Sequence, residues 1–204
     1  MNLRCTRGAE REYKDLSTGR EYFSVSQVLS VLDQNAFGSV PDAVLLAAQQ
    51  RGVDLHVIFG LLLLSLKGLC VRPDKPTGKL AGYFDAMEMF IADHRPIPVR
   101  VEEPATNERL GVAGTPDCLV RIGKILMLID LKTGGKRAIH NTQLAGGYHQ
   151  MNGYREAKQM GTLYVRDDGT YTLEPLKKAE ESFHVAWFQA GVSVLNGRRM
   201  YGVR

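Results

Sequence analysis

Residues 125–132 read ILMLIDLK, a run of five apolar residues followed by Asp130, Leu131 and Lys132. A short apolar run of this kind predicts a buried strand. Because side chains two residues apart on a strand face the same side, we expect Asp130 and Lys132 to project together and Leu131 to point away. The strand therefore ends in an acid and an amine at positions where the preceding apolar run predicts buried hydrophobic residues.

A second acid lies just upstream. Residues 114–117 read GTPD, within a segment, 111–120, that predicts another strand. The Gly123-Lys124 pair predicts a tight turn after it, so the two strands are expected to form an antiparallel hairpin. Such a hairpin allows Asp117 to lie near Asp130.

Two carboxylates at one point repel each other unless a cation lies between them. Mg²⁺ or Mn²⁺ would suit such a site, because both are hard ions that prefer oxygen ligands. The backbone carbonyl of Leu131 is available as a further ligand, and Lys132 can hold a water and stabilise charge at a phosphoryl centre. The alternative is a surface ion pair at a strand end, which is the usual origin of an isolated Asp-x-Lys. The apolar run and the upstream Gly-x-x-Asp favour a site.

The pattern Gly114-x-x-Asp117 followed by Asp130-x-Lys132 resembles the PD-(D/E)XK nuclease superfamily, in particular its RecB-like and Cas4-like exonuclease branch. The resemblance implies an α/β fold with a restriction-endonuclease-like core, in which a short mixed β-sheet carries the acids and is flanked by helices. It also implies hydrolysis of phosphodiester bonds with one or two divalent metals. By this similarity Asp117 and Asp130 would bind the metal, and Lys132 would position the attacking water.

The resemblance extends upstream. Residues 51–56, RGVDLH, are similar to a helical Arg-Gly-x-x-x-His element whose histidine contacts metal, which implies that His56 is a ligand. Gly52, His56 and Gly60 are spaced by four and share a helix face. A core histidine with a satisfied ring is the alternative.

An acidic residue also precedes the Gly-x-x-Asp segment, as in the family. By resemblance and spacing this residue is Glu102, which would complete or support the metal shell. Glu103 is adjacent and is expected to point the other way, toward solvent.

Downstream, residues 143–148 read QLAGGY and resemble the glutamine-to-tyrosine helix motif of the family. The resemblance implies that Gln143 and Tyr148 lie beside the metal site and contact the scissile strand or help to hold the lysine. The family pair is usually one helical turn apart, whereas here the interval is five residues. For Tyr148 an ordinary amphipathic helix is the alternative.

A basic loop follows the presumed catalytic strand. Gly134 and Gly135 would let the backbone approach a phosphate chain, and Lys136 and Arg137 are predicted to contact DNA. Most basic residues on small domains are simply solvated, which is the alternative for this loop.

Composition narrows the classes of function. The balance of 26 Lys and Arg against 22 Asp and Glu gives a net charge of +4, which suits a DNA partner without requiring one. The cysteines are too few and too scattered for a disulfide framework or a zinc cluster, and none follows Cys118, which excludes the four-cysteine iron–sulfur cluster of one family subgroup. No Gly-x-x-x-x-Gly-Lys-Ser/Thr element for ATP is present.

The apolar run at 57–64 is shorter than the roughly 20 residues that span a bilayer, and the first residues lack the apolar centre of a signal peptide. We therefore expect no membrane contact and a cytoplasmic location, in a bacterium or in a phage-infected host cell.

We expect residues 1–204 to form one domain, with a mainly helical part over 1–96 and the catalytic sheet with its flanking helices over 97–204. A hairpin around Gly19 and a short helix beginning at Ser24 or Ser26 open the chain. The remaining elements expected from periodicity and turn residues are helices at 43–66, 80–94, 141–159 and 177–195, and strands at 97–102, 111–120, 125–130, 162–165 and 171–173.

The resulting prediction is a metal-dependent DNA nuclease, most simply an exonuclease in recombination, repair or phage DNA processing. A structure-specific or site-specific endonuclease of the same superfamily and a non-catalytic DNA-binding or assembly module are the alternatives. The presence of both Asp130 and Lys132 favours an active enzyme. A homo-oligomer and a partner recombination or helicase protein remain open.

Overall fold

A mixed sheet carries the centre of the fold in the computed structural model, which describes residues 3–6, 12–33 and 41–203. Its strand order is β10-β9-β8-β7-β4, with β8 in parallel to β9 and the other neighbours antiparallel. The strands are β4 (Ile97–Val101), β7 (Cys118–Ile122), β8 (Ile125–Lys132), β9 (Gln159–Val165) and β10 (Tyr171–Pro175). The apolar run of β8 therefore lies at the middle of the sheet, where both edges of a strand are paired.

A second mixed sheet joins the start of the chain to its middle. Over the described residues its order is β1-β2-β3-β6-β5, and β3 pairs in parallel with β6. Its strands are β1 (Leu3–Thr6), β2 (Glu12–Asp15), β3 (Glu21–Ser24), β5 (Ala105–Asn107) and β6 (Val112–Gly114).

The prediction of one strand over 111–120 is wrong. The segment contains β6 and β7, which belong to different sheets, and residues 115–117 carry the chain from one sheet to the other. Pro116 lies in this crossing and has no N–H to donate to a ladder, which is consistent with the break.

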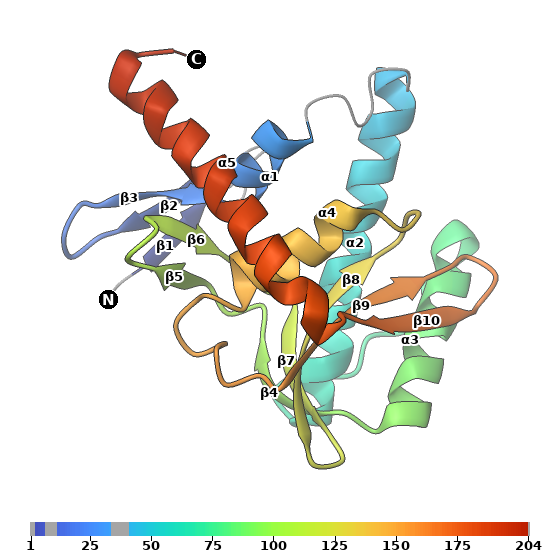
Figure 1. Ribbon diagram of the computed structural model, residues 1–204. Helices are drawn as coiled ribbons and strands as arrows, with labels where there is room; N and C mark the ends of the chain where they lie inside the picture. The colour runs from blue at the N-terminus through green and yellow to red at the C-terminus, as the bar shows by residue number, and fades with distance from the viewer. Residues whose placement is uncertain (1–2, 7–11, 34–40, 204) are drawn as a thin grey trace.

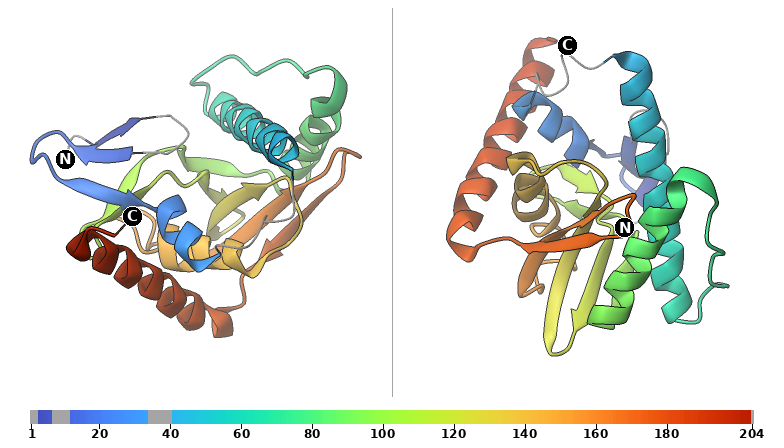
Figure 2. Two further views of the ribbon diagram at one scale, coloured as in Figure 1. Left: turned by 90° about the horizontal axis from the view of Figure 1, so that it is seen from above. Right: turned by 90° about the vertical axis from the view of Figure 1, so that its right-hand side faces the viewer.

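Helices cover both faces of the central sheet, and this arrangement confirms the predicted α/β fold with a short mixed sheet flanked by helices. Figures 1 and 2 show α2 and α3 on one side and α4 and α5 on the other. The α-helices are α1 (Val25–Leu32), α2 (Asp42–Leu66), α3 (Ala81–His94), α4 (Ala138–Thr142) and α5 (Glu181–Tyr201). A π-helix, η2 (Gln143–Tyr148), continues α4, and short 3₁₀ turns, η1 (Gly78–Leu80) and η3 (Lys178–Glu180), precede α3 and α5. Within the part of the chain that the structure describes, no helix has both the length and the apolar character needed to cross a membrane.

Several local signals are confirmed. Ser24 caps α1, accepting a hydrogen bond from the Gln27 N–H, while the Gln27 side chain accepts one from the Ser24 N–H. The hairpin turn between β7 and β8 contains Gly123 with a φ of 58°, and the turn between β9 and β10 contains Gly169 with a φ of 86°. Both glycines adopt the left-handed conformation that such turns require.

Two predicted helix boundaries are wrong. The helix expected over 141–159 ends with η2, and turns lead from there to β9. The last helix does not stop at Asn196-Gly197 but continues to Tyr201, where Gly202 with a φ of 65° ends it. Asn196 and Gly197 disfavour a helix only weakly, and the left-handed conformation that ends it is adopted at Gly202.

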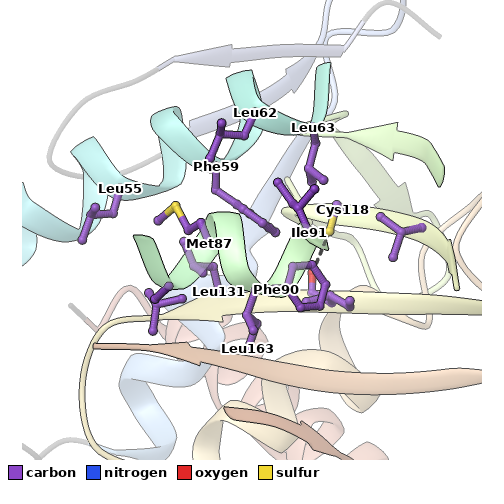
Figure 3. Close-up of a cluster of buried hydrophobic side chains, with 14 of the residues drawn as sticks. Leu55, Phe59, Leu62, Leu63, Met87, Phe90, Ile91, Cys118, Leu131 and Leu163 are labelled. Carbon is purple, nitrogen blue, oxygen red and sulfur yellow. Dashed lines mark hydrogen bonds between the residues drawn. The ribbon is translucent and has the colours of Figure 1, made fainter. Parts of the chain in front are cut away.

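The side chains of β8 alternate between two hydrophobic clusters, one on each face of the central sheet. Leu131 is fully buried with Leu163 of β9 against α2 and α3, as Figure 3 shows. Leu128 belongs to the cluster on the opposite face, with Leu144 and Phe188. Asp130 and Lys132 lie two and four residues after Leu128, so their side chains are on the same face of the strand, toward α4 and η2. Leu131 points to the opposite face, as the sequence predicts.

Helix α5 packs directly on the π-helix at Gly146. A Cβ at this position would lie 2.2 Å from Phe188 Cβ and 2.8 Å from the His184 carbonyl oxygen, so only glycine fits. A Cβ at Gly197, on α5 itself, would meet no atom within 4 Å apart from its chain neighbours and the nearby backbone of the same helix.

We predict that Gly146→Ala lowers the free energy of unfolding by about 1–3 kcal/mol, because the added methyl overpacks the contact with α5. Gly197→Ala is the matched control and is expected to raise it by about 0.5–1 kcal/mol, since alanine favours the helix and meets nothing. Urea unfolding followed by circular dichroism measures both. Equal effects of the two substitutions would contradict this packing.

Candidate metal centre and active site

The Asp117 carboxylate joins two separate elements of the fold. Its Oδ1 lies 2.9 Å from His56 Nδ1 on α2, and its Oδ2 accepts a hydrogen bond of 2.6 Å from the Leu131 N–H on β8. Asp117 is 6% exposed and directly precedes β7. The structure therefore brings the end of β8, the start of β7 and the middle of α2 to one point.

His56, Glu102 and Asp117 form a group whose potential ligand atoms all lie within 4.8 Å of one another. Glu102 follows β4, and its N–H donates to the Asp117 carbonyl oxygen at 2.9 Å. Gly60 follows His56 by four residues on α2, and a Cβ there would lie 3.4 Å from Glu102 Cγ. The glycine thus allows α2 to approach Glu102, whereas Gly52 faces open space.

The backbone of Glu102 has a φ of 50°, in the left-handed region that costs a non-glycine residue roughly 1 kcal/mol or more. Extended backbone would send consecutive side chains to opposite sides. The structure places Glu102 in the group, while Glu103 forms an exposed ion pair with Arg100 at 2.7 Å.

Asp130 and Lys132 lie beside this group, with Lys132 Nζ 2.6 Å from Asp130 Oδ2. Asp130 is 1% exposed, and apart from this ion pair neither carboxylate oxygen has a hydrogen-bond partner among the described residues. Burial raises the pKa of Asp130 to about 6, against the opposing effect of Lys132 and with a contribution from the Asp117 charge. Asp130 is not a member of the 4.8 Å group.

His56 and Asp117 shift each other's protonation. Burial alone would raise the pKa of Asp117, but His56 and Lys132, together with the Leu131 N–H, bring this pKa below its ordinary value. Burial alone would lower the pKa of His56, but the Asp117 charge and hydrogen bond raise it. The pair therefore favours a proton on His56, and a metal ion would have to replace that proton.

The donor set fits a hard divalent cation. It offers one imidazole and two carboxylates within a short distance, and the buried Asp130 carboxylate beside them has only Lys132 as a polar partner among the described residues. Imidazole with carboxylates suits Mn²⁺, and carboxylate oxygens also suit Mg²⁺. Leu131 contributes its N–H to Asp117, and a role of its carbonyl as a ligand stays a prediction.

Gln143 and Tyr148 contact each other across the π-helix, with Gln143 Nε2 donating to the Tyr148 hydroxyl at 2.8 Å. A π-helix bonds residue i to residue i+5, so two residues five apart become neighbours. Burial, with the Asp130 and Asp117 charges, raises the pKa of Tyr148 well above its ordinary value, and its hydroxyl keeps its proton. A Cβ at Gly114 would lie 2.9 Å from Tyr148 Cε1, so the glycine of the Gly-x-x-Asp segment makes room for this ring.

The two predicted DNA-binding residues of the loop after β8 have acidic partners. Lys136 lies 2.8 Å from Glu174 of β10, and Arg137 forms an ion pair with Asp33. DNA phosphates would have to compete with these carboxylates, and the role of the loop stays a prediction.

Sequence reasoning missed the residues of β9 that flank the acid and the amine. In the parallel register Thr162 is opposite Asp130 and Tyr164 is opposite Lys132. The Tyr164 hydroxyl lies 3.0 Å from His140 Nδ1, and burial together with the nearby Lys132 and Arg137 charges lowers the pKa of His140 to about 3. No local sequence pattern identifies these neighbours, because α4 and η2 separate β8 from β9 in the chain.

A cavity of about 520 Å³ lies apart from this site. Its walls are mainly apolar and include His94, Ile125, Met127 and Tyr171, from α3, β8 and β10. None of the residues of the polar group lines it.

We predict that Asp130→Asn stabilises the metal-free protein increasingly as the pH rises. The pKa of Asp130 is about 6 in the folded protein, against an ordinary value of 3.8. Between pH 3.8 and pH 6, Asp130 therefore carries a proton more often in the folded protein than in the unfolded chain. The wild type consequently loses stability as the pH rises through this range. The variant cannot ionise there, and its stability relative to the wild type should grow by about 2 kcal/mol between pH 4 and pH 7.

Urea unfolding in EDTA at several pH values measures this difference. Asp168→Asn is the control, because hydrogen bonds from Thr170 lower the pKa of Asp168. Its pH dependence therefore has the opposite sign and lies near and below pH 4, so its difference from the wild type should change little between pH 5 and pH 7. A flat difference for Asp130→Asn would mean that Asp130 ionises as it does in the unfolded chain.

No protein-family model matches this chain, and no curated protein sequence matches it. Similar solved structures include an alkaline exonuclease, LHK-Exo from Laribacter hongkongensis, at a TM-score of 0.41 and 15% identity over 90% of this chain and 95% of that one. LHK-Exo in complex with dAMP gives a TM-score of 0.43 and 14% identity over 88% and 90%. SSO0001 gives a TM-score of 0.41 and 14% identity over 84% and 75%. TM-scores of this size describe a loose similarity, so the functional proposal rests on the side-chain geometry of the site.

Proposed function

We propose that this protein is a metal-dependent nuclease that hydrolyses phosphodiester bonds in DNA. The observation that carries the proposal is the group of His56, Glu102 and Asp117 beside a buried, hydrogen-bond-deficient Asp130 and its Lys132. These three carboxylates, the imidazole and the neighbouring amine are the groups that metal-assisted hydrolysis needs.

His56, Glu102, Asp117 and Asp130 would hold Mg²⁺ or Mn²⁺. The bound cation would lower the pKa of a coordinated water and polarise an oxygen of the scissile phosphate. The hydrogen bond from the Leu131 N–H to Oδ2 fixes the orientation of the Asp117 carboxylate, and Oδ1 would bind the cation. His56 must give up its proton for the metal, which makes cation binding weaker at low pH.

Lys132 has a role that depends on Asp130. Its side chain is 19% exposed, and its ammonium pairs with Asp130 at 2.6 Å. Once the Asp130 carboxylate serves a cation, this ammonium becomes available to steady the attacking water and to stabilise negative charge on the phosphate. The acid and the amine therefore act as a pair on one strand face.

Gln143 and Tyr148 would orient the substrate or the lysine. The Tyr148 hydroxyl accepts from Gln143 and keeps a proton to donate. Lys136 and Arg137 would contact the DNA backbone by exchanging their acidic partners for phosphates, with affinity that falls as salt rises.

The exonuclease class is the finer part of this proposal and rests on the resemblance of the motifs to the RecB-like branch. We extend it to one nuclease domain over residues 1–204 that acts in recombination, repair or phage DNA processing. A structure-specific or site-specific endonuclease remains the second candidate, because the same residues would serve both.

We predict that the protein degrades linear DNA with Mg²⁺ or Mn²⁺ and that Lys132→Ala lowers the rate by about 10²–10³, because charge stabilisation at the phosphate is lost. Lys124→Ala is the matched control: it removes an exposed lysine from the turn at the other end of β8 and should leave the rate unchanged. End-labelled single-stranded, double-stranded and closed circular DNA, each tested with both metals, measure the activity.

Cutting of closed circular DNA as fast as linear DNA would assign the endonuclease class instead. Full activity of Lys132→Ala would mean that the hydrolysis comes from another site or another protein.

A further inference from the structure

The Thr162 side chain lies on the same sheet face as the buried acid of the site, and its hydroxyl has no ordinary hydrogen bond among the described residues. Thr162 of β9 is opposite Asp130 of β8 in the parallel register, so the two side chains share one face of the sheet. Both residues are 1% exposed. Thr162 Oγ1 and both Asp130 oxygens lack hydrogen bonds among the described residues, the ion pair with Lys132 aside.

A buried hydroxyl without a partner costs free energy, because it has lost its water and gained nothing in return. Valine has nearly the same shape as threonine and favours a strand as well. Packing alone therefore would not require threonine at this position. An unsatisfied buried group of this kind needs an explanation outside the packing of the strand.

Tyr164, two residues along on the same strand face, is a competing partner for this hydroxyl. Its hydroxyl lies 3.0 Å from His140 Nδ1. A contact from the Thr162 hydroxyl to the Tyr164 hydroxyl lowers the pKa of Tyr164 against the rise caused by burial, but this contact lacks the geometry of an ordinary hydrogen bond. The Thr162 hydroxyl is thus left without an ordinary hydrogen bond among the described residues, on the sheet face that it shares with Asp130.

We propose that Thr162 is a positioning residue of the cation site, whose hydroxyl hydrogen-bonds the hydration shell of the divalent ion held at Asp130. This inference rests on the proposed function. Mg²⁺ and, similarly, Mn²⁺ keep several waters when they bind a few carboxylates. Those waters need partners, and a hydroxyl can both donate and accept. Polar groups behind the ligands hold them in place and contribute to metal affinity.

The test compares Thr162→Val, which removes the hydroxyl at constant shape, with Thr162→Ser, which keeps the hydroxyl. Titration calorimetry of the full chain with Mn²⁺ alone measures affinity, and urea unfolding in EDTA measures the stability of the metal-free protein. We expect Thr162→Val to bind Mn²⁺ about 10-fold more weakly and to unfold at the same or a higher urea concentration than the wild type. Thr162→Ser should bind like the wild type.

Thr142→Val is the control for a buried hydroxyl with a partner, because Thr142 Oγ1 lies 2.9 Å from His184 Nδ1. It should unfold at a lower urea concentration in EDTA. If Thr162→Val does the same, its hydroxyl has a structural partner and the inference is overturned. If the wild type binds Mn²⁺ and Thr162→Val binds it equally well, the inference is overturned and the proposed function stands. If the wild type binds no Mn²⁺, the proposed function is overturned together with the inference.

Discussion

The two hydrogen-bonded contacts of the Asp117 carboxylate hold the candidate site together. One oxygen contacts His56 of α2 and the other accepts from the Leu131 N–H of β8, so a single side chain fixes a helix against a strand. Leu55 and Leu131, next to these contacts in the chain, are buried in one hydrophobic cluster. The apolar core therefore sets the distance between α2 and the sheet, and the polar site depends on that distance.

Asp130 is the part of the site that folding alone does not favour. Its carboxylate is buried and lies near the Asp117 charge, and apart from the ion pair with Lys132 it has no hydrogen bond among the described residues. Burial and Asp117 raise its pKa, and the charges of Lys132 and His56 oppose that rise. Removing a charge from water costs more than one ion pair returns unless further groups satisfy it. A bound cation would offset this cost, so protons and divalent ions are expected to compete for the same carboxylate.

The sequence predicts what depends on near neighbours. The apolar run and its period of two predict β8 and the shared face of Asp130 and Lys132. Gly123 and Gly169 predict the turns of the β7–β8 and β9–β10 hairpins. The sequence does not predict that residues 111–120 divide between two sheets, nor that β9 lies parallel to β8 and places Thr162 beside Asp130. Pairings of this kind depend on packing between segments far apart in the chain, and no local pattern encodes them.

The interval of five residues between Gln143 and Tyr148 illustrates how backbone type changes the meaning of a spacing. In an α-helix, residues five apart point in different directions, so on an α-helix this interval departs from a motif whose two residues are one turn apart. The π-helix brings the two side chains into hydrogen-bond contact at 2.8 Å. Gly146 and Gly147, which weaken an α-helix, permit α5 and α1 to pack closely on this turn. Tertiary packing thus supports the unusual helix, and the unusual helix brings the glutamine and the tyrosine together.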